Sequence, residues 1–103
     1  MTDPTLRRLR PSLVRSDRDG WEGYSVGQFA YRYDEGARHV DVPIERGLRA
    51  DGRATIELYP EELTWRGEDG SAVPLTAEET EMVVDRLRAG LLVLDVVPIV
   101  REP

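Results

Sequence analysis

The clearest local pattern in the chain is an alternation of residue types in two neighbouring segments. In residues 27–33 the odd positions from Phe29 on are aromatic, and in residues 38–45 the even positions from 40 on are β-branched. A period of two is typical of strands that bury one face. We therefore predict a hairpin with a four-residue loop at 34–37, in which Phe29 and Val42 face each other on the buried side.

A different periodicity predicts a helix at about residues 77–89. Thr76 and Glu79 have the spacing of a capping box, in which each side chain bonds the backbone amide of the other residue. Apolar residues recur every four positions from Val83 on, and acidic residues crowd the first turns. Gly90 stands where a left-handed C-terminal cap belongs, so we expect the helix to end there.

The remaining apolar segments predict further strands at 12–16, 54–59, 63–66, 71–73 and 91–100. The last of these is apolar except for Asp95, so we expect it to be buried on both faces inside the sheet, with pairing ending at Pro98. This order of elements predicts an α+β fold. Its sheet would be mostly antiparallel, with about five or six strands, and one helix would pack on one face before the final strand.

Composition narrows the chemistry that the chain can carry out. The 103 residues contain no Cys and no Lys, and His39 is the only histidine. These absences exclude thiolate nucleophiles, Cys-ligated zinc, Schiff bases and any site that needs two imidazoles. We expect no cofactor and no metal.

Charge is unevenly distributed along the sequence. Residues 1–20 contain five Arg and three Asp, whereas the remaining residues contain nine Arg and 17 acidic residues, for a net charge of -6. Since Pro4 and Pro11 limit any helix between them, we expect residues 1–11 to form a flexible or loosely docked basic arm on a single α+β domain, residues 12–103. The acidic body argues against nucleic acid and for a protein partner, which would itself be basic.

Targeting signals are not evident in the sequence. The N-terminal residues have no apolar stretch behind their charges, and residues 91–100 are too few to span a bilayer. We therefore expect a cytoplasmic protein without a membrane segment.

The polar face of the predicted hairpin holds the first candidate site. His39 has Asp41 two residues on and Arg32 opposite, and an Asp can orient a His as a general base for a nucleophile such as Ser25 or Ser71. His39, Asp41 and Glu45 also share a face and suggest a cation site. Because alternate residues on a strand lie about 6.6 Å apart, three of them reach one ion poorly. We favour a solvated surface over either site.

Two further candidates lie elsewhere in the chain. Trp21 and Tyr24, in a glycine-rich segment, are interpreted as packing at a strand end or as aromatic anchors of a protein interface, and we favour packing. Asp95 interrupts an apolar run, so it must have an Arg partner, be protonated, or lie at a sheet edge. A protonated Asp95 would be a candidate catalytic acid, whereas the other two states are structural.

The second half of the chain carries a family resemblance. Trp65 is followed by a turn at 67–70, a segment 74–79 that starts an amphipathic helix, and a final apolar strand. In this order of features residues 56–100 resemble small bacterial immunity proteins of contact-dependent and polymorphic toxin systems. The resemblance identifies no functional residue, and it implies a non-enzymatic inhibitor that binds one toxin.

Three functional hypotheses follow from the sequence. The leading one is a non-enzymatic acidic interaction protein, an immunity-type or regulatory partner of a basic protein. The alternative is a small ligand-binding domain or enzyme that uses carboxylate, Tyr and Arg groups in a sheet–helix cleft around Tyr31, Arg32 and His39. The third is a homodimer formed through an unpaired strand edge.

Overall fold

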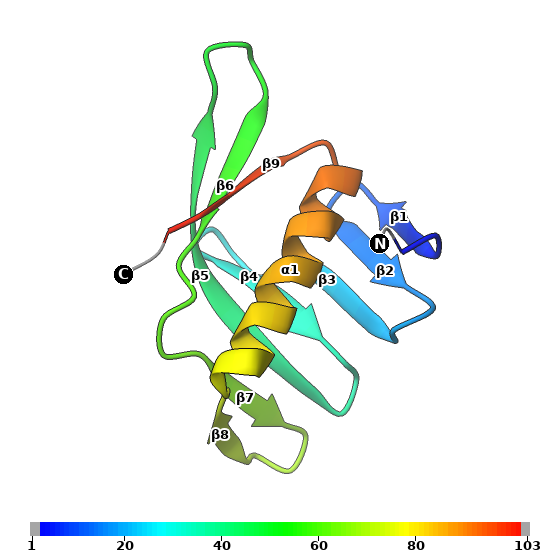
Figure 1. Ribbon diagram of the computed structural model, residues 1–103, viewed down its shortest axis with the longest axis vertical. Coiled ribbons are helices and arrows are strands. Elements are labelled where there is room, and N and C mark those ends of the chain that lie inside the picture. The colour runs from blue at the N-terminus through cyan, green and yellow to red at the C-terminus, as the bar shows by residue number, and fades with distance from the viewer. Residues whose placement is uncertain (1–2, 102–103) are drawn as a thin grey trace.

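The computed structural model describes residues 3–101 and has an α+β fold, as the sequence predicts (Figure 1). The strands are β1 (Leu6–Arg10), β2 (Leu13–Ser16), β3 (Trp21–Ser25), β4 (Ala30–Asp34), β5 (Arg38–Leu48), β6 (Ala54–Leu58), β7 (Thr64–Gly67), β8 (Ala72–Pro74) and β9 (Val97–Val100). The helix is α1 (Ala77–Val93). No helix in the described part of the chain is long and apolar enough to cross a membrane.

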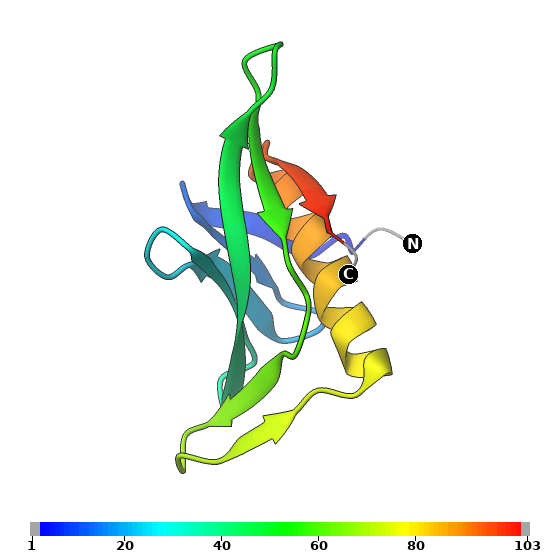
Figure 2. The ribbon, with the colours of Figure 1, turned by 90° about the vertical axis from the view of Figure 1, so that its left-hand side faces the viewer.

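A single curled sheet of nine strands packs one of its faces against the helix (Figures 1 and 2). Its main path runs β1-β2-β3-β4-β5-β6-β9, and every neighbouring pair is antiparallel except β6 and β9, which are parallel. The sheet contains more strands than expected because two segments that were not predicted as strands, Leu6–Arg10 and Trp21–Ser25, form β1 and β3. The sheet also branches at β5, which is long enough to pair with three strands. One edge of β5 pairs with β4, while the other edge pairs with β7 and then with β6. The tip of the β5–β6 hairpin projects beyond the rest of the molecule in both views.

The hairpin of β4 and β5 confirms the predicted buried face but not the predicted loop. Tyr33 lies opposite Val40 and Tyr31 opposite Val42, and all four side chains are buried. The Glu35 N–H donates to the Arg38 carbonyl, which leaves a two-residue turn at 36–37 in place of the four-residue loop. Gly36 has φ 90°, and glycine in this conformation is favoured in such tight turns.

The shorter turn shifts the register by two residues and changes the neighbours of each strand. Phe29 does not face Val42. It lies in the loop before β4 and is 70% exposed, so its prediction as a buried residue was wrong. On the opposite face, Arg32 pairs with Asp41 instead of His39, which lies opposite Asp34.

The start of α1 is as predicted, whereas its end is not. Thr76 and Glu79 form both hydrogen bonds of the capping box. The helix continues past Gly90 to Val93, because Gly90 is buried in the helix–sheet contact and is not a cap. A Cβ at Gly90 would lie 2.8 Å from Val14 Cγ1, so close packing accounts for the glycine.

The predicted strand at residues 91–100 was therefore wrong in its extent and its place. Its first part completes the helix and its last part forms β9, which lies half-buried at an edge of the sheet. Pro98 lies within β9 opposite Ile56 and does not end the pairing. The Arg101 N–H donates to the Leu58 carbonyl on β6, and the backbone groups of alternate residues in a strand point to opposite edges. Residue 98 therefore points its backbone groups to the open edge, where the N–H that proline lacks is not needed for pairing.

The core lies between the concave face of the sheet and α1. Its largest fully buried side chains are Tyr31, Tyr33, Leu58, Leu87 and Leu91. Aromatic rings extend the core across the sheet, since Tyr33 packs against Trp21 at 5.4 Å and against Trp65 at 6.0 Å between ring centroids. This layer fixes the helix over β1 to β3, where the candidate site lies.

The segment of residues 1–11 contains β1, which pairs antiparallel with β2. Arg7 lies opposite Arg15, and Arg8 opposite Val14. This ladder places part of the expected arm on the sheet. Its mobility, and its separation from residues 12–103 as a distinct unit, stay predictions.

Candidate functional site

A cleft of about 820 Å³ lies between β1, the β2–β3 turn and the C-terminal half of α1. Its apolar lining consists of Leu6, Trp21, Ala89, Leu92 and Val93. Its polar lining consists of Asp3, Arg18, Asp19, Asp85 and Arg86. Apolar and charged side chains thus meet beside the open edge of the sheet.

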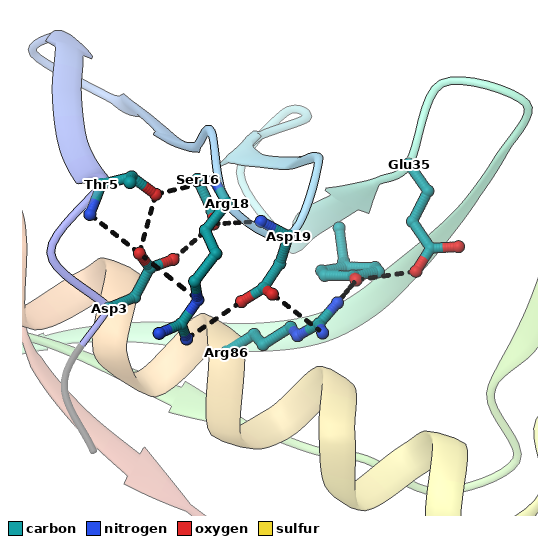
Figure 3. Close-up of polar contacts among 8 residues, drawn as sticks. Asp3, Thr5, Ser16, Arg18, Asp19, Glu35 and Arg86 are labelled. Atoms are coloured by element: carbon teal, nitrogen blue, oxygen red, sulfur yellow. Dashed lines mark hydrogen bonds and ion pairs between the residues drawn. The ribbon is translucent and has the colours of Figure 1, made fainter.

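Asp3 organises one wall of this cleft (Figure 3). One of its carboxylate oxygens accepts from the Thr5 N–H at 2.8 Å and from the Thr5 hydroxyl at 2.7 Å, and the other accepts from the Ser16 hydroxyl. The two hydroxyl groups accept in turn from the backbone of the β2–β3 turn, Thr5 from Arg18 and Ser16 from Asp19. This network attaches the segment before β1 to that turn.

A second set of contacts joins the turn to the helix. The Arg86 guanidinium donates to the Tyr33 hydroxyl at 2.7 Å, and that hydroxyl donates to Glu35 at 2.8 Å. Asp19 lies between two guanidinium groups, 3.2 Å from Arg18 and 4.0 Å from Arg86 (Figure 3). The two arginines of the cleft therefore share a carboxylate of the protein itself.

Two groups in this network, Asp3 and Tyr33, have pKa values far from neutral pH. The hydrogen bond from Ser16 lowers the pKa of Asp3 to about 2, with further lowering by Thr5 and Arg18 against the opposing effect of burial. Burial, and then the hydrogen bond to Glu35, raises the pKa of Tyr33. Asp3 is thus a carboxylate and Tyr33 a neutral phenol at neutral pH, and neither is matched to general acid–base catalysis there.

Four of the predicted site residues share the outer, convex face of the sheet instead. Arg32 donates to both oxygens of Asp41, at 2.7 and 3.0 Å, and this hydrogen bonding raises the pKa of Arg32. Tyr24 and His39 share this face, and the Tyr24 hydroxyl donates to Asp34 at 2.7 Å. The prediction that Arg32 faces His39 was wrong, because the register is shifted by two residues.

The arrangement around His39 does not form the considered catalytic set. Ser25 lies opposite Tyr31 and therefore shares the inner face of the sheet, whereas His39 lies on the outer face. The Ser25 hydroxyl accepts a hydrogen bond from Arg46. Tyr31 is buried on the inner face of the sheet, whereas Arg32 and His39 lie on the outer face. The three side chains therefore do not line the expected cleft. Within residues 3–101, no three His, Cys, Asp or Glu side chains are placed to hold a metal ion.

Trp21 and Asp95 have separate surroundings. Trp21 is 3% exposed and packs in the core, as the packing interpretation predicts, and its indole N–H has no hydrogen-bond partner among the described residues. The prediction that Asp95 lies on a buried strand was wrong, whereas its interpretation as an acid with an Arg partner agrees with the structure. Asp95 follows the helix with φ 62°, its side chain is 84% exposed, and it forms an ion pair with Arg53 at 3.0 Å.

Sequence patterns gave little indication of the residues in the cleft. Asp3, Arg18 and Arg86 come from segments far apart in the chain, and no short motif links them. One signal was present: Arg86 precedes the buried Leu87, so it flanks the apolar stripe of the helix and is positioned to reach the sheet.

The fold is therefore that of an α+β domain in which one helix packs against a curled sheet, with a cleft between the helix and the β1 edge of the sheet. Comparisons with known proteins find no matching family model, no matching curated protein and no matching solved structure. The resemblance of residues 56–100 to immunity proteins stays a prediction.

Proposed function

We propose that this protein is a non-enzymatic interaction protein that binds a basic partner protein through the acidic solvent face of α1. Glu78, Glu81 and Asp85 follow one another at helical spacing, and all three are exposed. A regulatory or immunity-type role, in which the bound partner is held inactive, is the most concrete form of this proposal.

The observation that carries this proposal is that no carboxylate of this helix face forms an ion pair within the described residues, and that the three carboxylates outnumber the one arginine on the same stripe, Arg88. Nine of the fourteen arginines pair with a carboxylate within the described residues. None of these pairs involves Glu78, Glu81 or Asp85. A surface with a net negative charge attracts basic molecules and speeds their encounter.

The chemistry of the cleft also supports a binding role. Its two arginines are occupied by Asp19, and the pKa of Asp3 and that of Tyr33 are shifted away from neutrality, in opposite directions. General acid–base catalysis needs a group that exchanges protons near the working pH. The ligand-binding alternative keeps one supporting observation, the volume of the cleft, and a shift in melting temperature with an added small molecule would favour it.

Capture from a lysate of the source organism tests the proposal. The tagged protein is compared with a helix variant, Glu78→Gln, Glu81→Gln and Asp85→Asn, and with a control, Glu45→Gln, Asp51→Asn and Asp95→Asn. Both variants lose the same charge, but the control changes acids at the β5–β6 hairpin and the α1–β9 turn. We expect one basic protein to be retained by the wild type and the control and lost by the helix variant. Equal retention by all three proteins, or no retained protein at low salt, contradicts the proposal.

A further inference from the structure

The open edge of β1 has unpaired backbone groups. Within residues 3–101, β1 ends the path of the sheet, so only one of its edges is covered by a strand. The Leu6 N–H donates to the Asp3 carbonyl at 3.3 Å and therefore points away from β2. Because these groups alternate along an antiparallel strand, Arg7 faces β2 and Arg8 directs its N–H and C=O to the open edge.

The cleft lies directly beside this edge. Leu6 contributes to the cleft from β1, and Ala89, Leu92 and Val93 contribute from the helix. Leu92 is 57% and Val93 38% exposed, so the helix extends an apolar wall past the last strand. Leu6 and Arg8 lie on the same face of β1, the face toward α1, and residues directly opposite in neighbouring strands share a face. Because the Asp3 carbonyl occupies the edge beside Leu6, a residue added across from Arg8 would place its side chain on this face, beside the cleft.

The charges on β1 indicate what kind of strand fits. Arg7, Arg8 and Arg10 are exposed on an otherwise acidic protein. Arg7 forms an ion pair with Asp17 at 3.2 Å, whereas the guanidinium of Arg8 donates only to the Pro11 carbonyl among the described residues. A strand from a second copy would place arginines beside arginines, which is unfavourable. Acidic side chains complement this edge.

We propose that β1 binds an extended acidic segment of another protein as an added strand, with one apolar side chain of that segment in the cleft. Backbone hydrogen bonds to Arg8 provide affinity, and the cleft and the arginines provide selectivity. The opposite edge of the sheet is less suited, because Pro98 occupies an outward-facing position of β9 and has no N–H to donate. The proposal does not depend on the acidic face of α1.

A synthetic peptide tests this inference with the full-length protein. The probe is a fluorescein-labelled peptide of about eight residues in which Glu alternates with Leu and Val, and the comparison peptide has Arg in place of Glu. Fluorescence anisotropy measures affinity for the wild type, for Arg8→Glu and for Leu92→Arg. Matched controls are Arg66→Glu and Val73→Arg, which change an exposed arginine and an exposed apolar residue on β7 and β8.

We expect the acidic peptide to bind and the Arg peptide not to bind. Arg8→Glu and Leu92→Arg should each weaken binding at least about tenfold, while the controls change it little. Amide exchange at Arg8 should slow when the peptide is added, which a contact through charge alone would not cause. The proposal is overturned by no binding at about 1 mM peptide, by equal losses in Arg8→Glu and Arg66→Glu, or by a dimer in light scattering that Arg8→Glu abolishes.

Discussion

Asp3 connects the segment before β1 to the β2–β3 turn through hydrogen bonds from Thr5 and Ser16. Connected hydrogen bonds of this kind reinforce one another, and they add to the short ladder that pairs β1 with β2. At the residue scale, the edge of the sheet therefore depends on one carboxylate and on its ionisation.

The ionisation of Asp3 gives a pH dependence of known sign. Folding lowers its pKa from the ordinary value 3.8 to about 2, so the carboxylate stabilises the fold at neutral pH and this contribution is lost as the pH falls through about 2. We expect Asp3→Asn to be less stable than the wild type in urea at pH 6, and the difference to shrink between pH 4 and pH 2. Asp17→Asn, at the exposed ion pair with Arg7, is the control. A difference that is constant with pH would contradict this account.

Gly90 is a residue whose role depends on packing. Alanine usually stabilises a helix interior by about 1 kcal/mol relative to glycine. At Gly90 its Cβ would lie 2.8 Å from Val14 and 3.3 Å from Trp21, and such overpacking costs about 1–3 kcal/mol. We expect Gly90→Ala to lower the free energy of unfolding measured in urea. A more stable Gly90→Ala protein would show that helix and sheet are less tightly packed.

At the scale of elements, the capping box sets the start of α1. The Thr76 hydroxyl accepts from the Glu79 N–H at 3.1 Å, and the Glu79 carboxylate accepts from the Thr76 N–H at 2.9 Å. Replacing a capping Thr by Ala costs about 1 kcal/mol. We expect this loss for Thr76→Ala in urea unfolding and little loss for Thr76→Asp, which keeps an acceptor. Equal stability of the two variants would mean that the cap contributes nothing.

Local signals predicted the elements that depend on local chemistry. The capping box and the alternating face of β4 and β5 were correct because both arise from neighbours in the sequence. The end of α1 was wrong because Gly90 satisfies a contact with β2 and β3, which no local pattern contains. The register was wrong because a two-residue turn at Gly36 replaced the expected loop.

Local sequence patterns could not predict the candidate site either, because its residues are far apart in the sequence. The cleft joins the first residues of the chain to the end of α1, and Arg86 reaches Tyr33 across 53 positions of sequence. The residues that the sequence indicated, such as Arg32 and Asp41, form ion pairs on the outer face instead. Composition was more informative, since it excluded thiol, lysine and paired-imidazole chemistry before any fold was known.

At the scale of the whole molecule, two surfaces of opposite charge lie on different elements. The acidic residues of α1 carry the proposed binding of a basic partner, and the arginines of β1 carry the proposed addition of an acidic strand. Asp85 belongs to the acidic face and also lines the cleft beside β1. Variants of Glu78 and Glu81 and variants of the β1 arginines change separate surfaces, so either proposal can fail alone. One protein could engage both surfaces if it contained a basic body and an acidic extended segment.

The salt dependence of partner affinity tests the interaction role most directly. Calorimetric titration of the captured protein with the wild type, the helix variant and the control variant (Glu45→Gln, Asp51→Asn and Asp95→Asn) would be repeated at increasing sodium chloride. Screening weakens attraction between exposed charges. We expect the affinity of the wild type and the control variant to fall steeply with salt, and that of the helix variant to be weak and nearly independent of salt. An affinity that is insensitive to salt, or the same salt dependence in all three proteins, would contradict binding through the acidic face of α1.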